Sequence, residues 1–368
     1  MATYKSIRYI VPTEAVEHTD SINALSDVDT NTTAPTDGQI LKWNNTTSKW
    51  YPGDVEEASN ISTTLGILVA GAMDTSSYYE IGSHVYVSNT GTFSQVSFSG
   101  DIQYGGGATY GGDKGFICQY NSYHLLSNTG VVGSNVSASV LALNGQTGLT
   151  YGLDKAIFGW GFAGSTGTYP NTVWNNHKSV LVSNTGVVGS DTTISTDSYR
   201  GEAQGFSYGG DKGIVIGGEG QDFANSASKT SSANRKNLIS NTGIVASETA
   251  CSGSKRYSGA GGEYGGDKGI QAYGTGNASS VGITSSNKVS NIGVVSSDIT
   301  GVGTGRIYTS YVRYGGDKGL ISGGIVVSSW SELQAHNLVS NTGVVAADVS
   351  AVATAREAAA ASGYSYSA

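Results

Sequence analysis

The sequence is short of charged residues, of cysteine and of long apolar runs, and each shortage argues against a class of protein. Charged residues make up 13% of the 368, the formal net charge is −8, and no basic run occurs, so binding to nucleic acid through its phosphates is not expected. Cys118 and Cys251 lie far apart, which predicts no disulfide framework. No signal-peptide-like run stands at the N-terminus. No stretch approaches the roughly 20 apolar residues of a membrane span, so membrane insertion is not expected.

Glycine and tyrosine are abundant instead, with 54 and 22 residues. The glycines follow no collagen-like period, and the polar residues are mainly serine, threonine and asparagine. This composition is typical of a chain built from β-strands and turns.

Two short strings recur along the chain at matching intervals. The copies of YGGDKG, including the variant YGLDKA, start at Tyr110, Tyr151, Tyr208, Tyr264 and Tyr314. The copies of SNTG, once written SNIG, start at Ser88, Ser127, Ser183, Ser240, Ser290 and Ser340. Successive copies of either string lie 39 to 57 residues apart, so the chain repeats one unit of about 50 residues.

Each unit has the pattern of four short strands. In residues 256–298 the runs are RYSGAGGEY, GIQAYG, NKVSN and GVVSSD, with Gly-Gly-Asp-Lys and Asn-Ile-Gly as turns after the first and third. Asn and Gly tolerate the positive φ that tight hairpin turns require. Small residues dominate the first strand, which suits a strand crowded against a central axis. Four antiparallel strands at this period predict an all-β fold, a six-bladed β-propeller over residues 61–368.

The two ends of the repeat region complement each other. LGILVAG at residues 65–71 matches a second strand, so the first unit has no innermost strand of its own. TAREAAAASGYSYSA at residues 354–368 matches an innermost strand without a turn after it. We therefore expect the C-terminal strand to pair with the first unit and to close the ring, which hides two sheet edges.

The repeats resemble the Kelch class of β-propeller. In four units an arginine precedes a Tyr by eight residues: Arg200, Arg256, Arg306 and Arg356. In two units a glycine pair ends the second strand, at residues 217–218 and 323–324. The tryptophan usual in the last Kelch strand is missing, and Ile102 and Leu143 replace the arginine in the first two YG units. The resemblance implies the fold and says little about function.

Residues 1–60 carry no repeat. An Asp37-Gly38 turn, the strand QILKW, a turn at Asn44-Asn45 and the run SKWYPG predict a small hairpin in which Trp43 and Trp50 are available for packing. Sixty such residues hardly bury a core alone, so a partner surface or self-assembly into a homo-oligomer is expected. The stretch LSDVDTNTTAPTDGQILKWNNTTSKWYPGD resembles a module of tail fibres and other appendages of tailed bacteriophages. The resemblance implies a virion protein, at the tail or capsid surface, that attaches to other virion proteins through residues 1–60.

The five Asp-Lys pairs could be parts of an active site, repeated metal or ligand sites, or copies of a turn. In a four-stranded blade, GGDK and SNTG share one face, so the pairs are spread around the rim, one to a blade. Asp favours such turns because its side chain bonds nearby backbone N–H groups, whereas calcium needs more oxygen ligands than one Asp supplies. We expect turns. No nucleophile or phosphate-loop motif is present, so neither an enzyme nor a cofactor is predicted.

The opposite face holds the long, variable connections, where recognition usually lies. Aromatic and histidine residues beside Asn, Asp and Gln suit sugar binding, or else they cover the blade ends; the candidates are Trp160, Tyr169, Trp174, His177, Phe223, Trp330 and His336. The four arginines could ring the axis and hold an acidic sugar, or bond backbone carbonyls of adjacent blades. The histidines lie in different blades without metal-binding spacing, so no metal site is expected.

These observations favour a tail-fibre or receptor-binding appendage that contacts a host surface glycan. A capsid or tail decoration protein is the alternative, and a polysaccharide-degrading enzyme on the propeller is a third candidate.

Overall fold

The computed structural model describes residues 27–29, 39–44, 46–54, 64–69, 83–97, 105–119, 121–141, 143, 145–162, 178–194, 198–222, 234–276, 281–350 and 359–365. The chain divides into two compact units, Met1–Asn60 and Ile61–Ala368. The described part is built of strands, with one short 3-10 turn at Ser139–Leu141. Among these residues no helix is long and apolar enough to cross a membrane.

The first unit contains the predicted hairpin. Strands β1 (Gln39–Asn44) and β2 (Lys49–Asp54) pair antiparallel with Trp43 opposite Trp50. The two indole rings meet edge to face, with their centroids 5.4 Å apart. At the turn, Asn44 Oδ1 accepts the N–H groups of Thr46 and Thr47 at 2.9 and 3.2 Å, which explains why this tight turn forms here.

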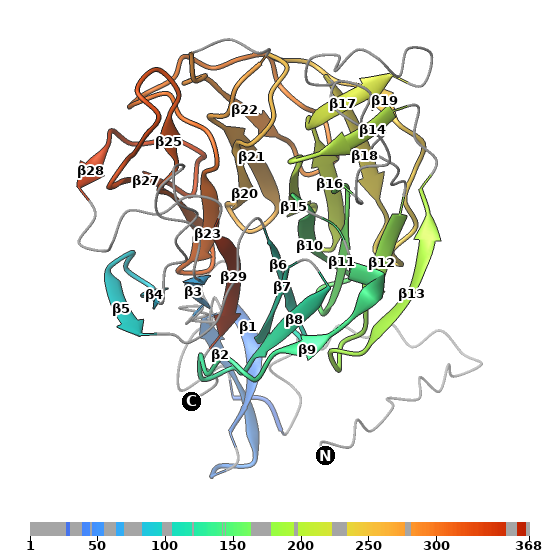
Figure 1. The fold of residues 1–368 in the computed structure, drawn as a ribbon. Helices are drawn as coiled ribbons and strands as arrows, with labels where there is room; N and C mark the ends of the chain where they lie inside the picture. Colours follow the sequence, from blue (N-terminus) through green and yellow to red (C-terminus); the bar gives the residue numbers. More distant parts are fainter. Residues whose placement is uncertain are drawn as a thin grey trace, which may run out of the picture. The chain divides into compact units, whose positions relative to one another are not determined.

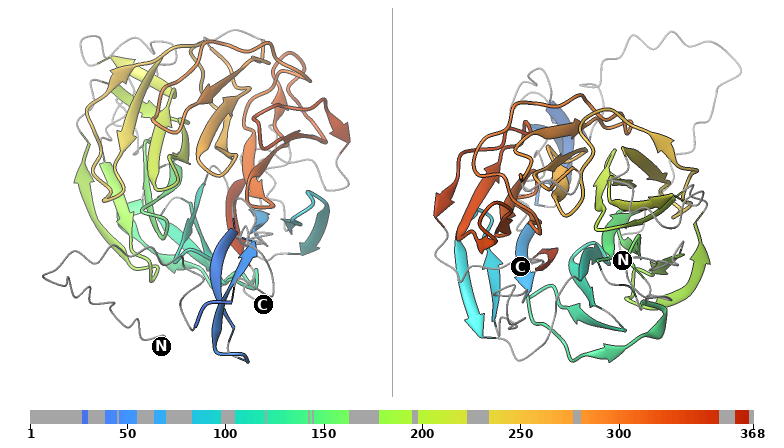
Figure 2. Two further views of the ribbon diagram at one scale, coloured as in Figure 1. Left: turned by 180° about the vertical axis from the view of Figure 1, so that it is seen from behind. Right: turned by 45° about the horizontal axis from the view of Figure 1, so that its top comes forward.

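The second unit is a six-bladed β-propeller, and Figure 2 (right) shows its blades around a central axis. From the inside outward, the first blade contains β29 (Ala360–Ser365), β3 (Thr64–Val69), β4 (Ser83–Val87) and β5 (Phe93–Ser97). The second contains β6 (Gly106–Tyr110), β7 (Lys114–Gln119), β8 (Ser122–Leu126) and β9 (Val136–Ser137). The third contains β10 (Thr147–Tyr151), β11 (Lys155–Gly159), β12 (Lys178–Val182) and β13 (Val188–Thr193).

The remaining blades follow the same order. The fourth contains β15 (Gln204–Tyr208), β16 (Lys212–Ile216), β18 (Arg235–Ile239) and β19 (Thr249–Ala250). The fifth contains β20 (Ala260–Tyr264), β21 (Lys268–Ala272) and β22 (Ser286–Val289). The sixth contains β23 (Ser310–Tyr314), β24 (Lys318–Ser322), β27 (Ala335–Val339) and β28 (Val349–Ser350). Two extra ribbons join β14 (Ser198–Gly201) to β17 (Glu219–Asp222) and β25 (Ile325–Val326) to β26 (Ser331–Glu332).

The outermost strands differ from the prediction. In the fourth and sixth blades they begin several residues after SNTG and are two residues long, and the described part of the fifth blade replaces its fourth strand by isolated bridges at Val295 and Ile299. In the fourth and sixth blades an asparagine side chain competes with the backbone for a carbonyl oxygen. Asn237 Nδ2 donates to Ala246 O at 3.0 Å, and Asn337 Nδ2 donates to Ala346 O at 2.9 Å. An asparagine of the third strand thus takes a carbonyl group that a regular ladder would use.

The ring closes as predicted. Strand β29 pairs antiparallel with β3, from Ala360 opposite Val69 to Ser365 opposite Thr64, and Figure 1 shows the two strands side by side. The apolar core lies between neighbouring blades, and at the closure it includes Leu68 and Val85 of the first blade with Val312 and Leu320 of the sixth. The first and sixth blades therefore pack against each other through an apolar core, as other neighbouring blades do.

The YGGDKG strings form the turns between the first and second strands of a blade, and the lysine is the first residue of the second strand. The Asp carboxylate accepts from its own lysine and from the Asn of its own SNTG, as in Asn241 Nδ2 to Asp211 Oδ2 at 2.9 Å. The two strings therefore share a face, as predicted. The first glycine also donates its N–H to the Asp carbonyl oxygen of the next blade, each at 2.7 Å: Gly111 to Asp154, Gly152 to Asp211, Gly209 to Asp267, and Gly265 to Asp317.

Candidate functional site

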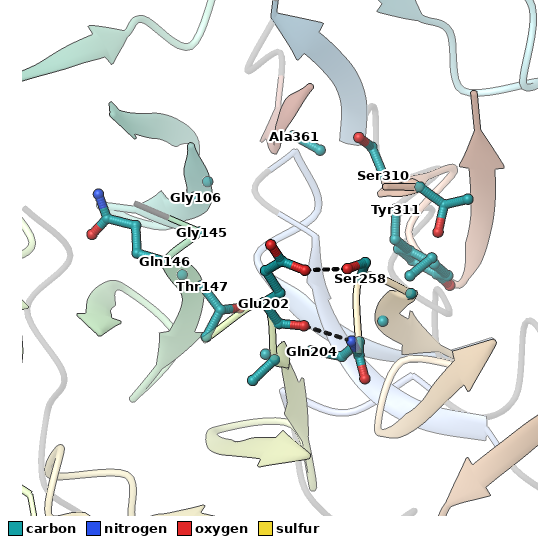
Figure 3. Close-up of a pocket in the computed structure, with 18 of the residues that line it drawn as sticks. Gly106, Gly145, Gln146, Thr147, Glu202, Gln204, Ser258, Ser310, Tyr311 and Ala361 are labelled. Carbon is teal, nitrogen blue, oxygen red and sulfur yellow. Dashed lines mark hydrogen bonds between the residues drawn. The ribbon is translucent and has the colours of Figure 1, made fainter. Parts of the chain in front are cut away.

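A polar cavity opens at the centre of the propeller, at the end where the innermost strands begin. Small residues at these strand starts, such as Gly106, Gly148, Gly205 and Gly261, leave a volume of about 150 Å³. A second cavity of about 200 Å³ lies at the other end of the same strands, beside the YGGDKG turns. We name the first cavity the channel mouth (Figure 3).

Three backbone hydrogen bonds join the third, fourth, fifth and sixth blades beside the channel mouth. Glu202, Ser258 and Tyr308 lie two residues before β15, β20 and β23, with φ values of 53°, 53° and 57°. Their N–H groups donate to the carbonyl oxygen of the matching residue one blade earlier: Glu202 to Gly145, Ser258 to Glu202, and Tyr308 to Ser258, at 2.9, 3.0 and 2.7 Å. A left-handed conformation costs a non-glycine residue roughly 1–2 kcal/mol. These hydrogen bonds hold Glu202, Ser258 and Tyr308 in the left-handed conformation.

The side chains at the channel mouth form a small network (Figure 3). The Ser258 hydroxyl donates to Glu202 Oε2, and Gln204 Nε2 donates to Glu202 O at 3.0 Å. Gln204 and Thr309 also line the cavity; they are 2% and 8% exposed, and Gln204 Oε1 and Thr309 Oγ1 have no hydrogen-bond partner. Among the described residues that line the channel mouth, Glu202 is the one with a formal charge.

Three of the four predicted arginines are buried inside their own blades. Each donates to a carbonyl oxygen at the end of the second strand and to the Asn of the third strand, and each lies 3.5 Å from an acid beyond it: Arg200 with Gly217, Asn237 and Glu248; Arg256 with Tyr273, Asn287 and Asp298; Arg306 with Gly323, Asn337 and Asp348. Burial lowers the pKa of Arg200 and Arg256 to about 10, so both stay charged at neutral pH. The hydrogen bonds of these side chains connect the strands of one blade, rather than adjacent blades, and the buried guanidinium groups present no face to a ligand.

The predicted aromatic and histidine residues are scattered. Trp160 is buried and its Nε1 lies 3.3 Å from Asn237 Oδ1 of the next blade. His336 is buried edge to face against Phe93 across the ring closure, with ring centroids 4.7 Å apart, and burial followed by the charge of Arg306 lowers its pKa. Trp330 is 58% exposed at the tip of the β25–β26 ribbon. The other candidates lie outside the described residues: Tyr169, Trp174, His177, Phe223 and Arg356.

Glu202, Ser258, Gln204 and Thr309 were not among the residues that the sequence suggested. A positional signal does exist, because Gly145, Glu202, Ser258 and Tyr308 each precede the tyrosine of a YG string by six residues. Aligning the repeats on this tyrosine places them at one position of successive blades. Their positive φ has no signal in sequence, since three of the four are not glycine.

The turn end of the channel has its own polar residues, one position before each tyrosine. Thr109, Thr150 and Ser207 bond backbone carbonyl oxygens of neighbouring innermost strands. In the fifth and sixth blades the same position holds Glu263 and Arg313, with Arg313 Nη1 3.1 Å from Glu263 Oε2. Burial raises the pKa of Glu263 to about 7, and the nearby Arg313 offsets part of this shift.

No family model and no curated protein matches this chain. Within the described residues, no group of three or more His, Cys, Asp or Glu side chains is arranged to hold a metal ion.

Proposed function

We propose that this chain is a structural protein of a tailed-bacteriophage virion, a tail-fibre or receptor-binding appendage whose Kelch-like propeller displays its loop face to a host surface glycan. The observation that carries the proposal is the difference between the two propeller faces. One face repeats the same short turns, with Asp and Asn bonded to each other. The other has the polar channel mouth and the exposed Trp330. Recognition by variable elements on a rigid scaffold suits the second face.

The hairpin of residues 1–60 supports attachment to other virion proteins. Trp43 and Trp50 are 44% and 39% exposed although their rings contact each other edge to face. Exposed tryptophans are frequent anchors of protein interfaces. We expect a Trp43→Ala, Trp50→Ala double variant to lose incorporation into virions while its propeller folds normally. Lys49→Ala, on the same hairpin, is the matched control and should be incorporated.

Electron microscopy of intact virions tests the proposal. Density or antibody labelling at the tail or capsid surface supports a virion location, and an array of host surface glycans that retains the purified chain supports receptor binding. Absence of the protein from purified virions would overturn the proposal.

A decoration or spacer protein is the second candidate. Three of the four arginines that were candidates for holding an acidic sugar are buried, so they cannot contact one, and this favours a role without sugar binding. Labelling along the capsid together with no retention on any glycan would favour that candidate. A polysaccharide-degrading enzyme draws less support: glycoside hydrolysis usually uses a pair of carboxylates, and the described lining of the channel mouth contains one carboxylate, that of Glu202.

A further inference from the structure

Several hydrogen-bond donors in the walls of the channel mouth are bonded to other groups of the protein, whereas some polar atoms there have no partner. The Ser258 hydroxyl donates to Glu202, the Ser310 hydroxyl donates to Ala359 O at 2.7 Å, and Gln204 Nε2 donates to Glu202 O. Gln204 Oε1 and Thr309 Oγ1 are buried and have no partner. Buried polar atoms without a partner are costly. A ligand that donates a hydrogen bond to Gln204 Oε1, and that donates to or accepts from the Thr309 hydroxyl, would remove that cost.

The charge at the channel mouth is negative. Glu202 is the one formally charged residue among those of its lining that the structure describes. The buried arginines of the fourth, fifth and sixth blades each lie 3.5 Å from an acid outside the cavity lining, Glu248, Asp298 or Asp348. An anionic group would be repelled here, and a cationic group would be attracted.

The backbone at Glu202 is strained, as it is at Ser258 and Tyr308. The third blade has Gly145 at the position of Glu202, with a φ of 58°, and glycine adopts this conformation without strain. Glu202 adopts it at a cost, and its carboxylate lies at the channel mouth (Figure 3). Strain of this kind gathers at binding sites.

We infer that the channel mouth binds one hydrogen-bond-donating, non-anionic sugar unit, and that the ammonium group of a 2-amino sugar is the best partner for Glu202. The inference rests on the proposed function of glycan recognition and names its ligand class. The expected charge of the ligand is opposite to the one that an arginine-lined site would select. The cavity is small, at about 150 Å³, and we therefore assign it a single terminal sugar ring.

Calorimetric titration of the full chain with three methyl glycosides tests the inference at pH 6.5. Methyl glucosaminide carries an ammonium group, methyl glucoside is neutral, and methyl glucuronide is anionic. We expect the glucosaminide to bind about tenfold more tightly than the glucoside, since a charge-assisted hydrogen bond adds about 1.4 kcal/mol. The glucuronide should bind weakest. Equal affinities, a preference for the glucuronide, or no binding of any of the three at millimolar concentration would overturn the inference.

Variants separate binding from folding. Glu202→Gln should lose the tenfold preference at an unchanged melting temperature, and Glu202→Gly should lose it while melting higher, because glycine removes the backbone strain. Glu332→Gln, the same change on β26 and outside the cavity, should keep the preference. If Glu202→Gln binds all three sugars like the wild type, the channel mouth is not the site. Retention of that variant on a glycan array would then leave the proposed function intact.

Discussion

The guanidinium group of Arg306 joins three strands of the sixth blade and lies 4.2 Å from the ring centroid of Tyr273 in the fifth. We predict that Arg306→Met lowers the free energy of unfolding by about 3–5 kcal/mol, because Gly323 O and Asn337 Oδ1 lose a charged donor inside the protein. Arg306→Lys should recover less than half of this loss, since an ammonium group cannot reproduce the planar fork of donors. Denaturant unfolding measures both, and a loss below about 1 kcal/mol for Met would show that water replaces these bonds.

The two glycines of a YGGDKG turn have unequal requirements. Both have positive φ, 62° at Gly209 and 78° at Gly210. A Cβ on Gly209 would lie 2.7 Å from Asn291 O of the next blade, whereas a Cβ on Gly210 would meet nothing within 4 Å. We therefore predict that Gly210→Ala costs about 1 kcal/mol of backbone strain and Gly209→Ala about 2–4 kcal/mol. Thermal unfolding of the matched pair checks this, and equal losses would disprove the contact between blades.

At the scale of elements, two ladders of backbone hydrogen bonds join the innermost strands, one at each end of the channel. At the turn end, the N–H group belongs to the earlier blade, as in Gly209 to Asp267. At the channel mouth it belongs to the later blade, as in Ser258 to Glu202. The repeated strings predicted the turns. They could not predict these ladders, because a repeat defines a residue's place within a blade and not which carbonyl group of the next blade it meets.

Glu263 makes stability depend on pH. It faces Arg313 and Tyr311 of β23 and the charge of Asp267 after its own strand. Its pKa is raised from 4.5 to about 7 by burial, so between these values the folded protein keeps a proton that the unfolded chain releases. Stability from this group must therefore fall as pH rises from 4.5 to 7, by at most about 3 kcal/mol.

The variant Glu263→Gln tests this assignment. It has no proton to release, so its melting temperature should fall less than that of the wild type between pH 4.5 and 7. Gln also accepts a hydrogen bond from Arg313, which keeps the contact. Parallel melting profiles for the two proteins would mean that Glu263 titrates close to its ordinary pKa when folded.

At the scale of the whole molecule, the fold could be predicted because it is repetitive. Tyr, Gly and Asn recur at matching intervals, and a missing first strand and a surplus last strand imply closure. The channel mouth could not, since Glu202 and Ser258 belong to different blades and meet only after the ring forms. The spacing identifies the arginines, and their bonds to backbone carbonyl groups could be predicted, but the blade to which those groups belong could not. Arg256 and Asn287 are 31 residues apart, and no motif in that interval indicates that the third strand returns beside the arginine.

Strand β29 holds the ring closed through both neighbours. Ser310 Oγ of the sixth blade donates to Ala359 O at 2.7 Å, and Ser362 Oγ donates to Ala108 O of the second blade at 2.8 Å. We predict that deleting residues 353–368 abolishes cooperative unfolding and exposes the edge of β3 to aggregation. Deleting only residues 366–368 leaves β29 intact and should change little. A synthetic peptide of residues 353–368 should restore a single transition when added to the truncated chain. A truncated chain that melts like the full one would contradict closure by this strand.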